Sequence, residues 1–141
     1  LSQLEDADKL KPEVKFIAMN NIAYANLTIN DPTLLDEADR YSTEAFKNMP
    51  WIAPLRGTRG SVLIELNKPK EGLELLRSSL EKTNTSAEKA STMSYIAIGE
   101  ARLGNQAEAQ RFVRAARLLD PKCAFLERAA QEAGMEGAKA G

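Results

Sequence analysis

Apolar residues recur at helical spacing along most of the chain, and short segments rich in polar residues, glycine or proline separate them. The clearest stretch is 103–121. Within it, Ala109, Val113 and Ala116 recur on one face of a predicted helix. Pro121 ends the stretch, because proline cannot continue a helix but can begin the next one. The small side chains predict that this helix packs closely against the preceding one.

Turn residues predict where the helices begin and end. Gly104 provides the left-handed backbone conformation that ends a helix at low cost. Thr33, Thr85 and Asn105 are expected to cap the helices that follow them, and an acidic residue stands three positions after each of them, where a capping partner belongs. Gly57 lies within a predicted helix. It either costs about 1 kcal/mol relative to alanine, or marks a close approach of two backbones, or indicates a helix that starts late.

The same criteria predict a succession of helices joined by short turns. With 141 residues, the chain has the length of one domain and can bury a core. The sequence therefore predicts an all-α domain. The expected helices span 1–10, 12–29, 34–50, 51–66, 69–83, 86–103, 105–120 and 122–134.

The stretch 103–121 resembles the second half of a tetratricopeptide repeat (TPR), a helix–turn–helix unit of about 34 residues. Gly104, Ala109, Ala116 and Pro121 stand at the spacing that is typical of this family. The resemblance implies a right-handed α-solenoid of antiparallel helix pairs, with about three TPR-like repeats and terminal capping helices. Three residues match the spacing earlier in the chain: Ala38, Ala45 and Pro50.

Positions that close a repeat recur at separations of 38, 34 and 37 residues, at Pro12, Pro50, Asn84 and Pro121. Turn insertions of three or four residues would explain the departures from the family's period. The N-terminal segment is either the second helix of a preceding repeat or a free-standing cap. The expected organisation is a single domain with a preceding or capping helix at 1–11, repeats at 12–50, 51–85 and 86–121, a C-terminal capping helix at 122–134 and a tail at 135–141.

The resemblance also implies a concave groove that is lined by the first helix of each repeat. The side chains expected there are polar, small and mostly uncharged, with Tyr24 and Tyr95 as aromatic anchors for an extended peptide. The alternative is that these residues form an ordinary solvated helix face. The predicted groove residues are Asn20, Asn21, Tyr24, Thr28, Thr58, Ser61, Glu65, Ser91, Ser94, Tyr95, Ile98 and Arg102.

Composition narrows the classes of function. The net charge of −1 gives no reason to expect a nucleic-acid partner. No apolar run approaches the length of about 18 residues that a membrane-spanning helix needs, so no membrane insertion is expected. The chain lacks histidine and the motifs of catalytic or metal sites, so we expect no enzyme, no cofactor and no metal. Cys123 is the only cysteine, which fits a reducing compartment and predicts a cytoplasmic protein.

The leading hypothesis is a non-enzymatic module that binds a peptide or protein segment in the groove. The alternative is a soluble structural or dimerisation tail of a larger protein, which could itself be attached to a membrane; in that case the partner is a second copy. The start at Leu1 instead of Met fits a part of a longer protein.

Charged residues refine the expected partner. Some TPR proteins hold a partner's terminal carboxylate with Lys, Asn and Arg residues on their first helices. The basic residues of that set are missing from the groove face here, so weak or no binding to acidic C-terminal tails is expected. Arg111, Arg114 and Arg117 recur every three residues on a second helix. They are expected to be solvated, with contact to phosphate or an acidic partner as the alternative.

Overall fold

The computed structural model describes residues 11–135, and every element in that range is helical, which confirms the all-α prediction. Apart from Lys11 and Met135, the predicted helix at 1–11 and the tail at 135–141 lie outside the described residues. The elements are α2 (Pro12–Ile29), the short 3₁₀ helix η1 (Pro32–Leu34), α3 (Leu35–Asn48), α4 (Ala53–Glu65), α5 (Pro69–Leu80), α6 (Ser86–Arg102), α7 (Gln106–Leu119) and α8 (Leu126–Glu132).

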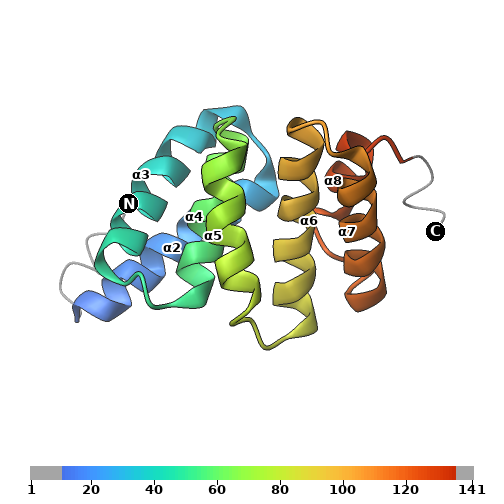
Figure 1. Cartoon of the computed structure of the whole chain (residues 1–141). Helices are drawn as coiled ribbons and strands as arrows, with labels where there is room; N and C mark the ends of the chain where they lie inside the picture. Colours follow the sequence, from blue (N-terminus) through green and yellow to red (C-terminus); the bar gives the residue numbers. More distant parts are fainter. Residues whose placement is uncertain (1–10, 136–141) are drawn as a thin grey trace.

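Helices that follow one another in the sequence pack side by side (Figure 1). The most extensive contacts join α2 to α3, α4 to α5, and α6 to α7. In addition, α2 contacts α4, and α4 contacts α6, so the first helices of the three pairs form one continuous layer. The C-terminal helix α8 packs against both α6 and α7.

The larger of two apolar clusters in the described chain extends through these helices and holds them together, and a smaller one consists of Ala45, Met49 and Leu55. The larger cluster is built largely from alanine and β-branched or leucine side chains, which permit close helix packing at native density. Burial of this apolar surface is the main driving force for the fold. One fully buried residue from each helix illustrates its extent: Ala23, Ala38, Val62, Leu76, Ile96, Val113 and Ala129.

Glycines allow α4 and α5 to approach each other closely. A Cβ atom at Gly72 would lie 2.7 Å from the carbonyl oxygen of Gly60, and one at Gly60 would lie 2.9 Å from the carbonyl oxygen of Gly72. Gly57 lies inside α4, where a Cβ atom would be 2.9 Å from Ser79 Oγ of α5. The predicted late helix start at Gly57 is wrong, because α4 begins at Ala53. The neighbours of Gly57 are side-chain atoms, so the close approach of two backbones occurs at Gly60 and Gly72 and not at Gly57.

Two predicted helix ends are confirmed. Gly104 has φ = 85° and follows the last residues of α6. Thr85 caps α6, because its Oγ1 accepts a hydrogen bond from the Glu88 backbone N–H at 3.1 Å. The Thr85 hydroxyl thereby satisfies a backbone N–H that the start of a helix leaves without a partner, and Gly104 lets the chain turn away at the end of the helix.

Two predicted caps are wrong. The side chain that caps the turn after α2 is Asp31, whose Oδ1 accepts from the Thr33 backbone N–H at 2.9 Å, whereas Thr33 Oγ1 donates to the same oxygen. Asn105 stands at the start of α7, but its amide donates to Glu100 Oε1 at 2.8 Å and makes no capping bond. In both cases a nearby carboxylate competes with the backbone for the side chain.

The last helix is shorter than expected. The sequence predicts a helix at 122–134, whereas α8 spans Leu126–Glu132 and Phe125 occupies its N-cap position. The preceding residues form a turn, in which the Asp120 carboxylate accepts from the Lys122 backbone N–H at 3.1 Å. This turn projects residues of the 120–125 segment toward α2 and α6, and it helps to form the pocket described next.

Candidate functional site

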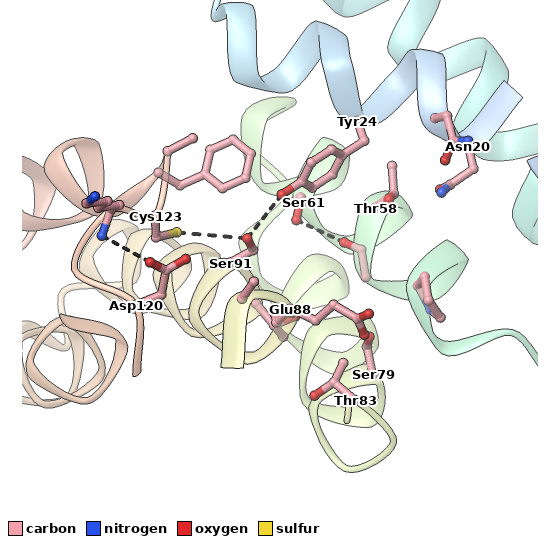
Figure 2. A pocket seen from close by; sticks show the side chains of 18 residues that line it. Asn20, Tyr24, Thr58, Ser61, Ser79, Thr83, Glu88, Ser91, Asp120 and Cys123 are labelled. Atoms are coloured by element: carbon pink, nitrogen blue, oxygen red, sulfur yellow. Dashed lines mark hydrogen bonds between the residues drawn. The ribbon is translucent and has the colours of Figure 1, made fainter. Parts of the chain in front are cut away.

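A pocket of about 380 Å³ opens beside the layer of first helices (Figure 2). Its walls come from the middle of α2, the first half of α4, the end of α5, the first turns of α6 and the turn between α7 and α8. Half of the predicted groove residues line it, and they come from all three first helices. These six are Asn20, Asn21, Tyr24, Thr58, Ser61 and Ser91.

Three other predicted groove residues belong to the core. Tyr95 is only 1% exposed, and Ser94 and Ile98 are fully buried. The prediction that Tyr95 is an accessible aromatic anchor is therefore wrong. The helical phase predicted that these side chains lie on the surface, but α8 and the turn before it cover this part of α6. Phe125 packs on the Tyr95 ring. Arg128 donates to the Tyr95 hydroxyl at 3.3 Å.

The remaining three predicted groove residues lie outside the pocket. Thr28 is exposed in the last turn of α2 and donates to the Ala25 carbonyl at 2.7 Å. Glu65 and Arg102 belong to a network of polar side chains that joins α4, α6 and α8. The predicted set therefore divides between an open pocket, the core and this network.

The aromatic wall of the pocket is formed by Tyr24 and Phe125. Their rings meet edge to face, with centroids 5.6 Å apart. The Tyr24 hydroxyl lies 3.1 Å from Ser91 Oγ, which in turn lies 3.8 Å from Cys123 Sγ. Contacts on both sides thus fix this aromatic wall, which connects α2 with the turn before α8.

Hydroxyl groups line much of the rest of the pocket, and four of them already donate a hydrogen bond within the protein. Each donates to a backbone carbonyl at 2.8–3.0 Å, and three of these bonds stay within the residue's own helix or turn. Toward a ligand, these oxygens present lone pairs and so act only as acceptors. The four residues are Ser61, Ser79, Thr83 and Thr92.

Asn20 is the most unusual polar residue of the pocket. Its side chain is buried, with 7% of the residue exposed, and its Oδ1 has no hydrogen-bond partner. A buried acceptor without a donor costs about 1–3 kcal/mol. Such groups are rare in native structures and require an explanation.

Three charged residues stand at the rim: Glu88, Asp120 and Lys122. Within residues 11–135, neither the Glu88 carboxylate nor the Lys122 ammonium forms a salt bridge or a side-chain hydrogen bond. The Asp120 carboxylate accepts one backbone bond, from Lys122. The rim therefore carries two negative charges and one positive charge at neutral pH.

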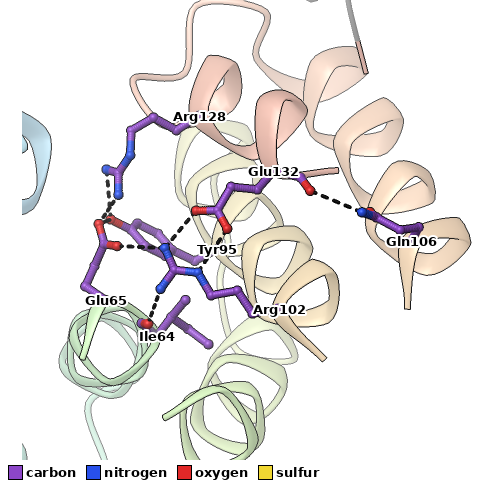
Figure 3. A network of polar contacts seen from close by, with 7 residues as sticks. All are labelled: Ile64, Glu65, Tyr95, Arg102, Gln106, Arg128 and Glu132. Carbon is purple, nitrogen blue, oxygen red and sulfur yellow. Dashed lines mark hydrogen bonds and ion pairs between the residues drawn. The ribbon is translucent and has the colours of Figure 1, made fainter. Parts of the chain in front are cut away.

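The polar network lies farther along the same face of α6, toward the C-terminal end of the helix, and its contacts hold helices together (Figure 3). Glu65 of α4 accepts from the Tyr95 hydroxyl at 3.0 Å, pairs with Arg128 of α8 and lies 3.5 Å from Arg102 of α6. Arg102 also forms a two-pronged ion pair with Glu132, at 2.9 and 2.7 Å, and donates to a backbone carbonyl of α4. Two acidic and two basic groups thus balance each other, and the network fastens α8 to α4 and α6.

Burial governs the protonation of this network. Removal from water raises the pKa of the Tyr95 hydroxyl well above its usual value, and the negative charge of Glu65 raises it further. Its hydrogen bond to Glu132 raises the pKa of Arg102. These effects keep Tyr95 neutral and Arg102 charged, which suits a permanent structural contact.

The arginine series on α7 does not form one site. Arg111 pairs with Glu108 at 2.7 Å and lies over the Phe112 ring. Arg117 is half-buried and its Nε and Nη2 atoms lack hydrogen-bond partners, whereas Arg114 is exposed. Three residues at regular spacing therefore have three different surroundings.

The sequence did not point to the residues that the α7–α8 turn and the end of α5 contribute to the pocket. Cys123 and Phe125 were expected in a helix, and Asp120, Lys122 and Ala124 had no assigned role, because the turn was not recognised. Ser79 belongs to α5, a second helix, which the resemblance places outside the groove, and Thr83 lies in the segment that follows α5. The one sequence signal that bears on the position of Ser79 was Gly57 in the facing helix, because the missing side chain leaves room for Ser79.

Comparisons of the chain with protein-family models, with curated proteins and with solved structures found no match. No helix within residues 11–135 combines the length and the apolar character that crossing a bilayer requires. In the same range, no three His, Cys, Asp or Glu side chains gather in a way that could hold a metal ion.

Proposed function

We propose that this domain is a non-enzymatic interaction module of the TPR type, which holds an extended segment of a partner protein in the pocket between α2, α4, α6 and the α7–α8 turn. The observation that carries the proposal is the pocket itself: it opens where side chains from all three first helices converge, and six of them were expected to contact a peptide from sequence alone. In this proposal the three helix pairs are antiparallel TPR-like units of a short right-handed solenoid, and α8 is its C-terminal cap.

The chemistry of the pocket supports recognition of a peptide. Amide and hydroxyl groups surround an aromatic wall, and such a combination can orient a polypeptide backbone while an apolar side chain packs on the rings. Asn20 and Asn21 offer carboxamides, which can both donate to and accept from a peptide group. Tyr24 supplies a large rigid contact surface, a property shared by many energetically dominant interface residues. The free, half-buried thiol of Cys123 suits the cytoplasmic location that we propose.

Selection from a displayed library of random nine-residue peptides tests this function. The wild-type chain is the bait, and the selected peptides are then measured against two tryptophan variants by fluorescence anisotropy. Ala87→Trp places a large side chain in the pocket from the second residue of α6, whereas Ala107→Trp makes the same change at the second residue of α7, outside the pocket. Both alanines are exposed, so both variants should fold.

The proposal predicts that selected peptides bind the wild type and Ala107→Trp equally and that Ala87→Trp reduces their affinity at least tenfold. If no peptide is selected, or if the selected peptides bind Ala87→Trp as well as the wild type, the pocket is not the binding site and the proposed function is wrong.

A further inference from the structure

The pocket is rich in hydrogen-bond acceptors and poor in free donors. The four hydroxyls that donate to backbone carbonyls have only lone pairs to offer. The remaining side-chain donors are the carboxamides of Asn20 and Asn21, the Thr58 hydroxyl, the ammonium of Lys122 and one hydrogen of the linked Tyr24, Ser91 and Cys123 groups. A ligand that brings many donors therefore fits this surface better than one that brings acceptors.

Asn20 gives a second and independent indication that the pocket suits a ligand with hydrogen-bond donors. Its orphaned oxygen is an acceptor in a residue that lines the pocket. A ligand N–H that reached this oxygen would remove the cost of an unsatisfied buried acceptor.

The charges at the rim of the pocket and its aromatic surface both favour a cationic ligand. The carboxylates of Glu88 and Asp120 outnumber the single ammonium of Lys122 at the rim (Figure 2). The Glu88 carboxylate has no partner within residues 11–135, so it is available to an incoming cation. Tyr24 lines the pocket and is 39% exposed, and the face of its aromatic ring can stabilise a nearby cation further.

We infer that the pocket selects a partner segment by an arginine side chain, whose guanidinium group enters between Asn20, Glu88 and the aromatic wall. The inference rests on the proposed function, since it names the chemistry of the peptide that this pocket binds. A guanidinium has five N–H donors and no acceptor, which matches a surface of acceptors. A glutamate or aspartate side chain would instead place acceptors against acceptors and add negative charge to the rim.

Three small probes that differ in one side chain test the inference on the full chain: N-acetyl-arginine amide, N-acetyl-norleucine amide and N-acetyl-glutamate amide. Each is titrated into ¹⁵N-labelled protein, and the chemical shifts of the backbone amides of Asn20, Ser61 and Ser91 report on the pocket. The arginine probe should bind there at least tenfold more tightly than the norleucine probe, and the glutamate probe should bind most weakly. The affinity of the arginine probe should fall with rising salt concentration, because an exposed ion pair is screened.

Two matched variants test whether the preference for the arginine probe comes from the Glu88 carboxylate at the rim. Glu88→Gln removes the unpaired carboxylate and should weaken the arginine probe about three- to fivefold, which is the range of an exposed ion pair. Glu74→Gln removes an exposed carboxylate of α5 that does not line the pocket, and it should leave the affinity unchanged.

Equal binding of the arginine and norleucine probes, or stronger binding of the glutamate probe, would overturn the inference. So would an arginine preference that Glu88→Gln and Glu74→Gln reduce equally, or the absence of pocket shifts with all three probes. None of these results touches the proposed function, which fails if the displayed library yields no peptide or if the selected peptides do not use the pocket.

Discussion

Phe125, which directly precedes α8, lies edge-on against Tyr24 of α2, with ring centroids 5.6 Å apart and an interplanar angle of 89°. On its other side, Phe125 packs on Tyr95 of α6, with centroids 4.8 Å apart. One buried ring thus joins the first described helix, the third helix pair and the last turn. The wall of the pocket consequently depends on residues that are distant in sequence.

Replacement of Phe125 by alanine should destabilise the fold strongly. The ring is 1% exposed and belongs to the core, and truncation of a buried phenylalanine typically costs about 3–5 kcal/mol. Urea denaturation followed by circular dichroism measures this loss. Leu118→Ala is the control, because Leu118 is 87% exposed and its truncation should change the free energy of unfolding by less than about 0.5 kcal/mol. A loss below about 1 kcal/mol for Phe125→Ala would contradict the packing described here.

Tyr95→Phe should change how stability depends on pH. At pH 8 the variant loses a buried hydrogen bond to Glu65, and we expect a loss of about 1.5–3 kcal/mol, as for hydrogen bonds to charged groups. Because burial raises the pKa of Tyr95 above the ordinary tyrosine value of about 10, the hydroxyl in the unfolded chain ionises first. Its contribution to stability is therefore complete below pH 10 and is lost as the pH rises above that value. Urea titrations at pH 8 and pH 11 should show the gap between wild type and variant narrowing; a constant or widening gap would be inconsistent with this burial.

Gly72→Ala should destabilise the protein although alanine has the higher helix propensity. Propensity alone would favour the variant by about 1 kcal/mol. However, the new Cβ atom would lie 2.7 Å from a backbone oxygen of α4, and overpacking of this kind costs about 1–3 kcal/mol. The control is Glu74→Ala on the exposed side of the same helix, for which we expect a change within about 0.5 kcal/mol. Thermal unfolding of both variants compares these effects, and a stabilised Gly72→Ala protein would show that α4 and α5 are not in close contact.

The oligomeric state distinguishes the interaction module from the dimerisation alternative. We expect a concentration-independent mass near 15.5 kDa in size-exclusion chromatography coupled to light scattering, which would leave the pocket free for a partner. A stable dimer would favour self-association. If Ala87→Trp also converted such a dimer to a monomer, the second copy itself would occupy the pocket.

Local sequence signals predicted the helices well because each signal acts within one element. Pro12 and Pro69 begin α2 and α5, and Gly104 follows α6 in the left-handed conformation, as expected from their backbone preferences. The predicted caps at Thr33 and Asn105 were wrong because carboxylates outside the capping pattern, those of Asp31 and Glu100, bind these side chains.

The candidate site was predicted only in part, because periodicity tells which face a helix could expose and not which later element covers it. The face of α6 that carries Ser91 remains open in its first turns, whereas the continuation of that face at Tyr95 and Ile98 is buried. The chain that covers it begins with Phe125, in a turn that was expected to be helical. Tertiary packing therefore decided which half of the predicted groove became the pocket.

Chemical-shift mapping with a peptide from the displayed library shows directly whether the pocket binds a peptide segment. The ¹⁵N-labelled chain is titrated with the selected peptide, and the shifted backbone amides are compared with the residues that line the pocket. We expect the largest shifts at Tyr24, Ser61 and Ser91 on the three first helices. Shifts confined to α3, α5 and α7, the second helices of the three pairs, would contradict binding in the pocket.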